Sequence, residues 1–111
     1  MASQTVIESP TPKMLAEVEN GIGWITFNSP ARRNAMSLDM WQGLADILRQ
    51  MSQDDSLRVV VLKGAGDKAF VSGADISEFE EKRSNQEDRD AYENAFDDAL
   101  GNLANFSRPV V

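Results

Sequence analysis

Strand-like and helix-like spacings of apolar residues alternate along this chain, and a pair of strand-like runs comes first. Apolar residues recur at strand-like spacing over residues 14–19 and again over 22–28, with Asn20-Gly21 between the two runs. This dipeptide is the strongest short signal for a two-residue hairpin turn. Ser29-Pro30 then interrupts the second run, because proline cannot donate a backbone hydrogen bond to a strand ladder. The pattern predicts a β-hairpin.

A helix-like spacing follows the hairpin. Ser37 stands where an N-cap would satisfy free backbone N–H groups, and Asp39 complements the helix dipole. From there we expect a helix that runs to about Gln53. Its apolar residues recur at three- and four-residue steps and predict one buried stripe, made of Leu38, Trp41, Leu44, Ala45, Ile47, Leu48 and Met51.

A continuous apolar run comes next. Residues 57–62 contain Val59-Val60-Val61-Leu62, which is typical of a strand buried on both faces, as in a parallel sheet covered by helices. The segment Gly64-Ala65-Gly66-Asp67 predicts a turn, because it lacks the further residues of a nucleotide-binding loop. The polar stretch up to Asn85 is expected to form a mobile loop or a short helix.

A second helix is expected over residues 86–106. Its apolar residues gather on one side, as Tyr92, Ala95, Phe96, Ala99, Leu100, Leu103 and Phe106. Arg108-Pro109-Val110-Val111 then resembles the start of a new strand. Two apolar residues alone have little to pair with or bury, so we expect this strand to continue in residues that follow Val111.

These elements predict an α/β fold class built of ββα units. Residues 1–13 show no periodicity and are expected to form a flexible N-terminal arm, with residues 14–111 forming one domain or part of one. The arm resembles neither a secretory signal nor a transit peptide. No apolar run approaches the roughly 20 residues of a membrane span. A cytoplasmic location is the default expectation.

Composition limits the chemistry available to the chain. Its 111 residues include no Cys and no His. A disulfide, a thiolate or imidazole metal ligand, and a Ser-His or Cys-His catalytic pair are therefore excluded within it, and no metal site is predicted. Any chemistry must use carboxylates, hydroxyls, Lys or backbone N–H groups.

The net charge of −7 is concentrated between Asp75 and Asp98. Ten acidic and three basic residues in that stretch give −7 by themselves, and the remaining residues balance at eight against eight. Such a run is typical of a solvated helix face, with a surface that docks a partner as the alternative. It argues against nucleic-acid binding, which needs a basic surface.

Two short segments carry candidate chemistry. In Ser72-Gly73-Ala74-Asp75-Ile76, small residues let a ligand approach backbone N–H groups that can hold an anion or a developing oxyanion. A tight strand-to-helix turn is the alternative interpretation. Arg32 and Arg33 lie in a turn after Pro30, where paired guanidinium groups suit phosphate. A proline turn that leads into an N-cap explains much of this second segment without a ligand.

Taken together, the two segments resemble the N-terminal half of the enoyl-CoA hydratase/isomerase (crotonase) family. The resemblance rests on Asn28-Ser29-Pro30-Ala31-Arg32-Arg33-Asn34-Ala35-Met36-Ser37, followed further along by Ala69-Phe70-Val71-Ser72-Gly73-Ala74-Asp75-Ile76. It covers nearly all of residues 14–111. The implied fold is crotonase-like, and this chain would supply its incomplete N-terminal part.

The resemblance implies roles for individual residues. Ala74 corresponds to the residue whose backbone N–H is one of two oxyanion-hole donors, and Arg32 to a residue that contacts CoA. The predicted site residues are Ala31, Arg32, Asn34, Ser72, Gly73, Ala74, Asp75 and Ile76. The family's second donor and catalytic Glu residues would follow Val111, and Glu78, Glu80 and Glu81 match no catalytic position.

The resemblance also implies an activity and partners. We expect a hydratase/isomerase-type enzyme of fatty acid metabolism, with an acyl-CoA or enoyl-CoA thioester as substrate, no permanently bound cofactor, and a homotrimer or hexamer. The remaining C-terminal half of the same protein is an expected partner, and this chain alone is expected to be inactive. The alternative is a non-catalytic CoA-binding or interaction protein of the same fold. RNA binding, known among family relatives, is disfavoured by the acidic second helix.

Overall fold

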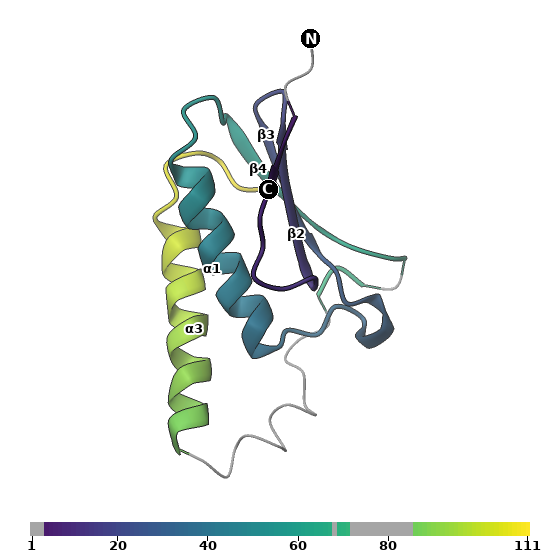
Figure 1. The fold of residues 1–111 in the computed structure, drawn as a ribbon, viewed down its shortest axis with the longest axis vertical. Coiled ribbons are helices and arrows are strands. Elements are labelled where there is room, and N and C mark those ends of the chain that lie inside the picture. Colours follow the sequence, from purple (N-terminus) through teal and green to yellow (C-terminus); the bar gives the residue numbers. More distant parts are fainter. Residues whose placement is uncertain (1–3, 68, 72–85) are drawn as a thin grey trace.

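The computed structural model describes residues 4–67, 69–71 and 86–111, and its ribbon places the helices together on one side of a sheet (Figure 1). The elements in chain order are β1 (Gln4–Ile7), β2 (Met14–Glu19), β3 (Ile22–Phe27), the 3₁₀ turn η1 (Pro30–Arg32), α1 (Leu38–Ser52), β4 (Val59–Gly64) and α3 (Gln86–Ala104). The architecture is α/β, as predicted.

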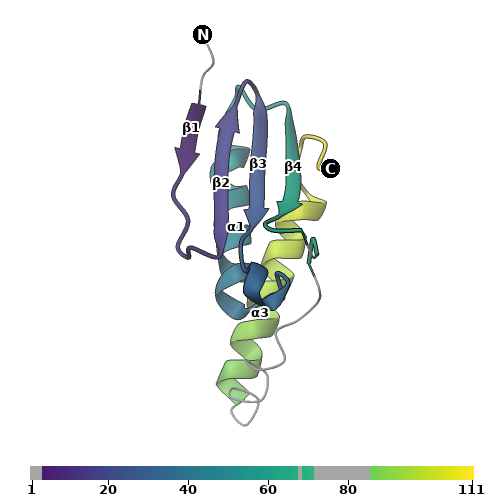
Figure 2. The ribbon, with the colours of Figure 1, turned by 90° about the vertical axis from the view of Figure 1, so that its right-hand side faces the viewer.

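The four strands form one sheet in the order β1-β2-β3-β4 (Figure 2). β1 and β2 pair antiparallel, as do β2 and β3, whereas β3 and β4 run parallel. The hairpin is confirmed, and its turn has positive φ at both central residues, 53° at Asn20 and 81° at Gly21. These angles match the twist of antiparallel strands and explain why Asn-Gly is favoured there.

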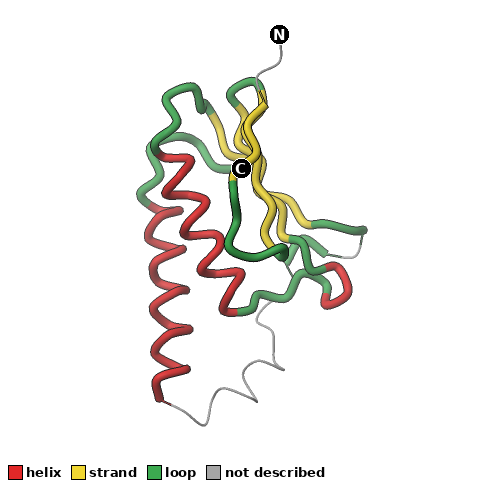
Figure 3. Tube along the Cα trace, viewed as in Figure 1, coloured by secondary structure: helices red, strands yellow, loops and turns green. Residues whose placement is uncertain are grey.

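Both helices cover the same face of the sheet (Figure 3). The stripe predicted for α1 is confirmed at Leu44, Ala45, Ile47, Leu48 and Met51, all fully or almost fully buried against the sheet and α3. Ser37 is the N-cap residue, but its hydroxyl caps no backbone N–H and donates instead to the Asp39 carboxylate.

The prediction of a flexible N-terminal arm over residues 1–13 did not include a strand, but the structure has β1 there. Residues 4–7 pair with β2, with Val6 opposite Glu17 and Ile7 opposite Ala16. Pairing at a sheet edge depends on backbone N–H and C=O groups, so it needs no alternation of apolar and polar side chains. Val6 is 75% exposed, which is why the sequence pattern gave no signal.

The prediction that the strand over residues 57–62 is buried on both faces is wrong within the described residues. Val60 is fully buried beneath the helices and Leu62 packs against the core, while Val59 and Val61 are only partly covered. Successive side chains of a strand point to opposite faces. Because both described helices lie on one face, the apolar run is half covered.

The second helix is confirmed, and its apolar side is narrower than the sequence indicated. Ala95 and Ala99 are buried, whereas Phe96 and Leu100 are 37% and 41% exposed. The Phe96 ring still meets the Trp41 ring edge-on at 4.8 Å between centroids. Small Ala side chains let the two helices approach closely, and the larger residues lie at the flank of the contact.

The expected strand after Arg108 is present as a short parallel bridge between Val110 and Val60. The Val60 N–H donates to the Pro109 carbonyl at 2.9 Å, and the Val111 N–H donates to the Val60 carbonyl at 2.8 Å. The Arg108 guanidinium donates to the carbonyls of Ser52 and Asp54 at the end of α1, at 3.3 and 2.8 Å. The two backbone bonds extend the parallel part of the sheet beyond β4, and the Arg108 bonds hold this end of the chain against the end of α1.

A cluster around Asp39 ties the β1–β2 connection to the start of α1. The Asp39 carboxylate accepts hydrogen bonds from the hydroxyls of Ser37 and Thr11, and Lys13 Nζ lies 3.5 Å away. Burial alone would raise the pKa of Asp39, but the two hydroxyls and the Lys13 charge together hold it below its ordinary value of 3.8.

The lowered pKa of Asp39 leads to a prediction about stability and pH. Because the folded pKa lies below the unfolded one, the carboxylate stabilises the fold above about pH 4, and this contribution is lost as the pH falls through the folded pKa. Asp39→Asn should cost about 0.5–1 kcal/mol at pH 7, since solvent screens a half-exposed group, and less at pH 3. Thermal unfolding midpoints at both pH values test this, with Asp55→Asn as an exposed control. An equal loss at both pH values would contradict the assignment.

Candidate functional site

The parallel pair β3 and β4 brings two loops to one edge of the sheet. β3 leads into η1, and β4 leads into a loop described at residues 65–67 and 69–71, so both loops leave the carboxyl ends of neighbouring strands (Figure 2). In open α/β sheets, ligands bind outside the carboxyl ends of the strands. Sequence-predicted site residues lie on these two loops.

The turn after β3 is a short, tightly bonded structure. The N–H groups of Arg32 and Asn34 both donate to the Ser29 carbonyl, at 3.0 and 2.8 Å, and the Arg33 N–H donates to the Pro30 carbonyl at 3.0 Å. Arg33 and Asn34 have positive φ of 53° and 58°. The turn therefore reverses the chain within a few residues.

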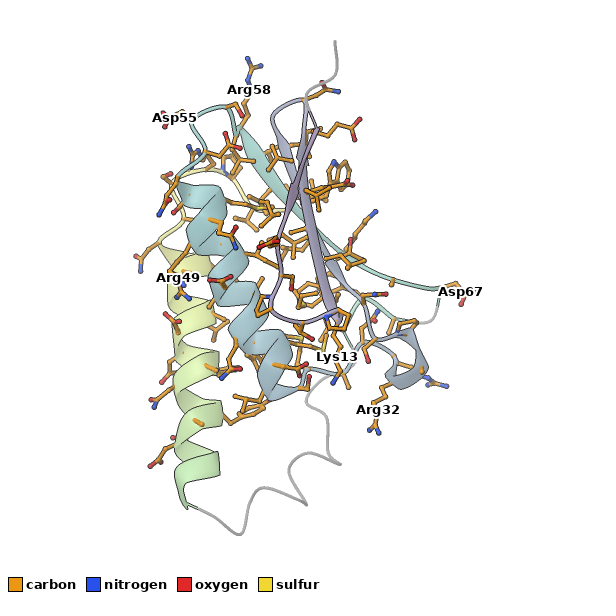
Figure 4. The ribbon with its side chains drawn as sticks, in the orientation of Figure 1. Lys13, Arg32, Arg49, Asp55, Arg58 and Asp67 are labelled. Carbon is orange, nitrogen blue, oxygen red and sulfur yellow. The ribbon has the colours of Figure 1, made fainter. Side chains whose placement is uncertain are left out.

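The predicted CoA-contacting residues of this turn have different environments. Ala31 and Arg32 are exposed, as is Arg33, and Figure 4 shows Arg32 extending from η1 away from the sheet. The side chain of Asn34, by contrast, is completely buried. The Arg32 side chain is thus accessible from solvent, whereas the Asn34 carboxamide faces the protein.

The buried Asn34 carboxamide joins the two loops. Its Oδ1 accepts the Ser29 N–H at 2.8 Å, and its Nδ2 donates to the carbonyls of Ala65 at 3.0 Å and Ala69 at 2.8 Å. Sequence reasoning missed this role. The available signal was the residue type, because Asn tolerates the left-handed conformation and bonds readily to nearby backbone.

The loop after β4 lies directly against the end of its own strand. A Cβ atom added at Gly64 would stand only 2.6 Å from the Phe70 carbonyl oxygen and 2.7 Å from that of Ala69. The Ala65 N–H donates to the Phe27 carbonyl at 2.8 Å, and the rings of Phe27 and Phe70 meet edge-on with centroids 5.2 Å apart. The turn predicted at Gly64–Asp67 is present as a bend over residues 65–67, with φ of 80° at Gly66, whereas Gly64 itself is the last residue of β4.

The remaining predicted site residues fall outside the described part of the chain. These are Ser72, Gly73, Ala74, Asp75 and Ile76, which follow Val71 directly in sequence. The polar stretch up to Asn85 lies outside it as well. The structure therefore places Ala31, Arg32 and Asn34 beside the loop that leads to the second predicted segment.

Charge around the two loops is sparse within the described ranges. Arg32 and Arg33 lie on the turn, and Asp67 is at the outer end of the bend after β4 (Figure 4).

Of the acidic stretch, Asp90, Glu93, Asp97 and Asp98 are described and exposed, as expected of a solvated helix face. Asp98 pairs with Arg49 of α1 at 2.9 Å. Among residues 4–67, 69–71 and 86–111, no cluster of acidic residues is arranged to hold a metal ion.

A broad, open groove lies elsewhere, beside the strand connection that precedes β2. Its lining includes Val6, Leu15, Trp24 and Lys63, with the Lys63 ammonium 5.4 Å from the centre of the Trp24 ring. None of the sequence-predicted site residues lines it. We therefore place the candidate site at the two loops and not in this groove.

No helix in the described ranges is long and apolar enough to cross a membrane.

Comparison with known proteins agrees with the fold described above. The enoyl-CoA hydratase/isomerase family model matches residues 17–111. Hydroxycinnamoyl-CoA hydratase-lyase of Pseudomonas fluorescens is 40% identical over 63 residues, which are 57% of this chain and 22% of that protein. Short-chain-enoyl-CoA hydratase of Clostridium acetobutylicum is 35% identical over 68 residues, which are 61% of this chain and 26% of that protein.

A solved structure gives the same result for the fold. The crystal structure of an enoyl-CoA hydratase/carnithine racemase from Magnetospirillum magneticum superposes with a TM-score of 0.83 at 40% identity. The superposition covers 92% of this chain and 38% of the other. The chain thus spans well under half the length of the relatives it matches. It belongs to the enoyl-CoA hydratase/isomerase family and has a crotonase-like α/β fold.

Proposed function

We propose that the protein containing this chain is a hydratase or isomerase of enoyl-CoA or related acyl-CoA thioesters. In this proposal the chain supplies the CoA-contacting turn and one backbone donor of an oxyanion hole, the N–H of Ala74. The observation that carries the proposal is the family match over residues 17–111, together with an exposed Arg32 beside the loop that leads toward Ala74.

The chemistry of such a site suits a chain without His or Cys. When a thioester is converted to its enolate, negative charge develops on the carbonyl oxygen, and fixed N–H groups aimed at that oxygen stabilise the transition state. A backbone donor requires no particular side chain. In the family resemblance, a second donor and Glu residues that move protons come from residues that would follow Val111.

The turn after β3 is proposed to hold the CoA end of the substrate. CoA carries several phosphate groups, and a guanidinium binds phosphate through paired, charge-assisted hydrogen bonds. Ala31 and Arg32 are proposed CoA contacts on this turn, and Ser72, Gly73, Asp75 and Ile76 are proposed contacts on the second segment. Asn34 is not among them, because its side chain is fully buried. CoA enters as part of the substrate, with no permanently bound cofactor. A homo-oligomer, a cytoplasmic location and a place in fatty acid metabolism complete the proposal.

Turnover by the complete protein tests the function. We expect it to hydrate or isomerise a short enoyl-CoA, followed by product chromatography, and we expect residues 1–111 alone to show no turnover. CoA binding without turnover of any enoyl-CoA, across short and long acyl chains, would instead favour the non-catalytic CoA-binding protein.

Arg32 gives a sharper test of the CoA-binding turn. Arg32→Ala should raise KM for an enoyl-CoA about tenfold and leave kcat nearly unchanged, because the phosphate contact is the same in the ground state and the transition state. KM for the matching pantetheine thioester, which lacks the nucleotide, should not change.

A neighbouring residue provides the matched control for Arg32. Arg33→Gly removes the same charge from the same turn, and its φ of 53° suits glycine. The variant should have KM values closer to those of the unmodified protein. Equal effects of Arg32→Ala on the CoA and pantetheine substrates would contradict a contact with the nucleotide end.

A further inference from the structure

We propose that Asn34 is a positioning residue, whose carboxamide fixes the loop leading to Ala74 against the turn that carries Arg32. The inference rests on the proposed function, because it concerns the alignment of the two loops of that site. It goes beyond a CoA contact, since the Asn34 side chain is fully buried and its hydrogen bonds within the described residues all join it to backbone atoms.

The three hydrogen bonds of Asn34 reach across a large separation in sequence. One bond, to the Ser29 N–H, closes the turn itself, and the other two reach the carbonyls of Ala65 and Ala69 on the loop after β4. Both N–H groups of the carboxamide are used on this loop. This one side chain therefore ties the loop after β3 to the loop after β4 through three hydrogen bonds.

Other residue types do not reproduce this arrangement. Asp would keep the shape and the bond from Ser29, but it lacks both N–H donors and would turn a carboxylate oxygen toward the carbonyls of Ala65 and Ala69. Gly would accept the φ of 58° without strain, but it has no side chain. Ala has no hydrogen-bonding side chain either, and unlike Gly it would be strained at this positive φ. Asn satisfies the left-handed backbone and all three partners at once.

The consequence for the reaction follows from where the loop leads. Residues 69–71 continue directly into Ser72-Gly73-Ala74, the segment proposed to carry the oxyanion donor. Besides the Asn34 bonds, the described contacts of the loop include the Ala65–Phe27 hydrogen bond, the Phe27–Phe70 ring contact, the approach of Gly66 to Pro30 and the packing of Val71 against the core. A displacement of about 1 Å at a reacting group can lower a rate about 10²-fold. Loss of Asn34 should therefore lower kcat more than it raises KM.

The test compares Asn34→Asp and Asn34→Gly with the unmodified complete protein, in turnover of a short enoyl-CoA well below the unfolding midpoint of every variant. We expect kcat to fall tenfold or more in both variants, with KM changed less than threefold. Asn20→Gly is the matched control, because Asn20 also has a φ of 53° but lies in the β2–β3 hairpin turn and is exposed. It should retain full kcat. A purely structural role would lower the unfolding midpoint without this split between kcat and KM.

A double-mutant cycle with Ala74→Pro separates this inference from the proposed function. If Asn34 acts through the Ala74 donor, Asn34→Asp should cost little further kcat once that donor is absent. An Ala74→Pro variant with undiminished kcat would overturn the proposed function itself. If Ala74→Pro lowers kcat as expected, then full additivity with Asn34→Asp, or an unchanged kcat in Asn34→Asp alone, would overturn the positioning role.

Discussion

Replacing Ala74 with proline in the complete protein is expected to lower kcat for an enoyl-CoA about 10²- to 10³-fold. Proline has no backbone N–H, so the substitution removes the proposed oxyanion donor, and removal of one such donor is typically worth about 2.7–4 kcal/mol of transition-state stabilisation. Because the charge on the carbonyl oxygen is largest in the transition state, the loss should appear in kcat more than in KM. Steady-state kinetics on a purified, folded variant measures it.

Two controls make the Ala74 prediction specific. Ala74→Gly keeps the N–H and should stay within a few-fold of the unmodified kcat, although glycine costs some backbone order. Binding of free CoA, which has no thioester carbonyl, should be retained by Ala74→Pro if only the donor is lost. A folded Ala74→Pro variant that binds CoA and keeps full kcat would rule out this residue as a donor.

The parts of the fold that local chemistry determines could be predicted from the sequence. Asn20-Gly21 gives a turn because both residues adopt positive φ at low cost, and this sets the pairing of β2 with β3. The stripe on α1 is readable because a helix with one apolar face must bury it. In both cases the information lies within a short stretch of chain.

The parts of the fold that depend on which elements pack beside them could not be predicted in the same way. The pairing of β1 uses backbone groups and leaves Val6 exposed, so no apolar pattern marks it. The run Val59-Val60-Val61-Leu62 has the composition of a doubly covered strand, yet within the described residues only one face of β4 has helices on it. Sequence pattern indicates which residues can be buried, and the arrangement of other elements decides which of them are.

The candidate site likewise has one part that can be proposed from the sequence and another part that only the structure shows. Arg32 can be proposed as a CoA contact from the sequence alone, because a guanidinium in a turn fits a family position and has a simple chemical use. The role of Asn34 was missed because its partners, Ala65 and Ala69, are backbone carbonyls whose position has no signature in residue type. Long-range bonds from a side chain to backbone become visible only when the two loops are placed in space.

Gly64→Ala should be strongly damaging, although it adds only one methyl group. The added methyl group would lie 2.6–2.7 Å from backbone atoms of Ala69 and Phe70, which cannot swing aside as the end of a flexible side chain can. Overpacking of this kind costs about 1–3 kcal/mol of stability. If the loop moves to relieve the clash, the Asn34 bonds lengthen, and kcat should fall about 10²-fold by misplacement of the proposed site. Thermal unfolding and steady-state kinetics of the complete protein measure the two effects.

Gly101→Ala is the matched control for Gly64→Ala, because a Cβ atom at Gly101 would meet nothing within 4 Å. Gly101 lies inside α3, where alanine is favoured over glycine by about 0.5–1 kcal/mol, so this variant should be slightly more stable and fully active. The two substitutions add the same methyl group and differ only in what surrounds it. If Gly64→Ala were as stable and active as Gly101→Ala, the close approach of the loop to the end of β4 would have no part in stability or catalysis. The opposite result would show that the backbone contact at Gly64 holds the loop in the position that the proposed reaction requires.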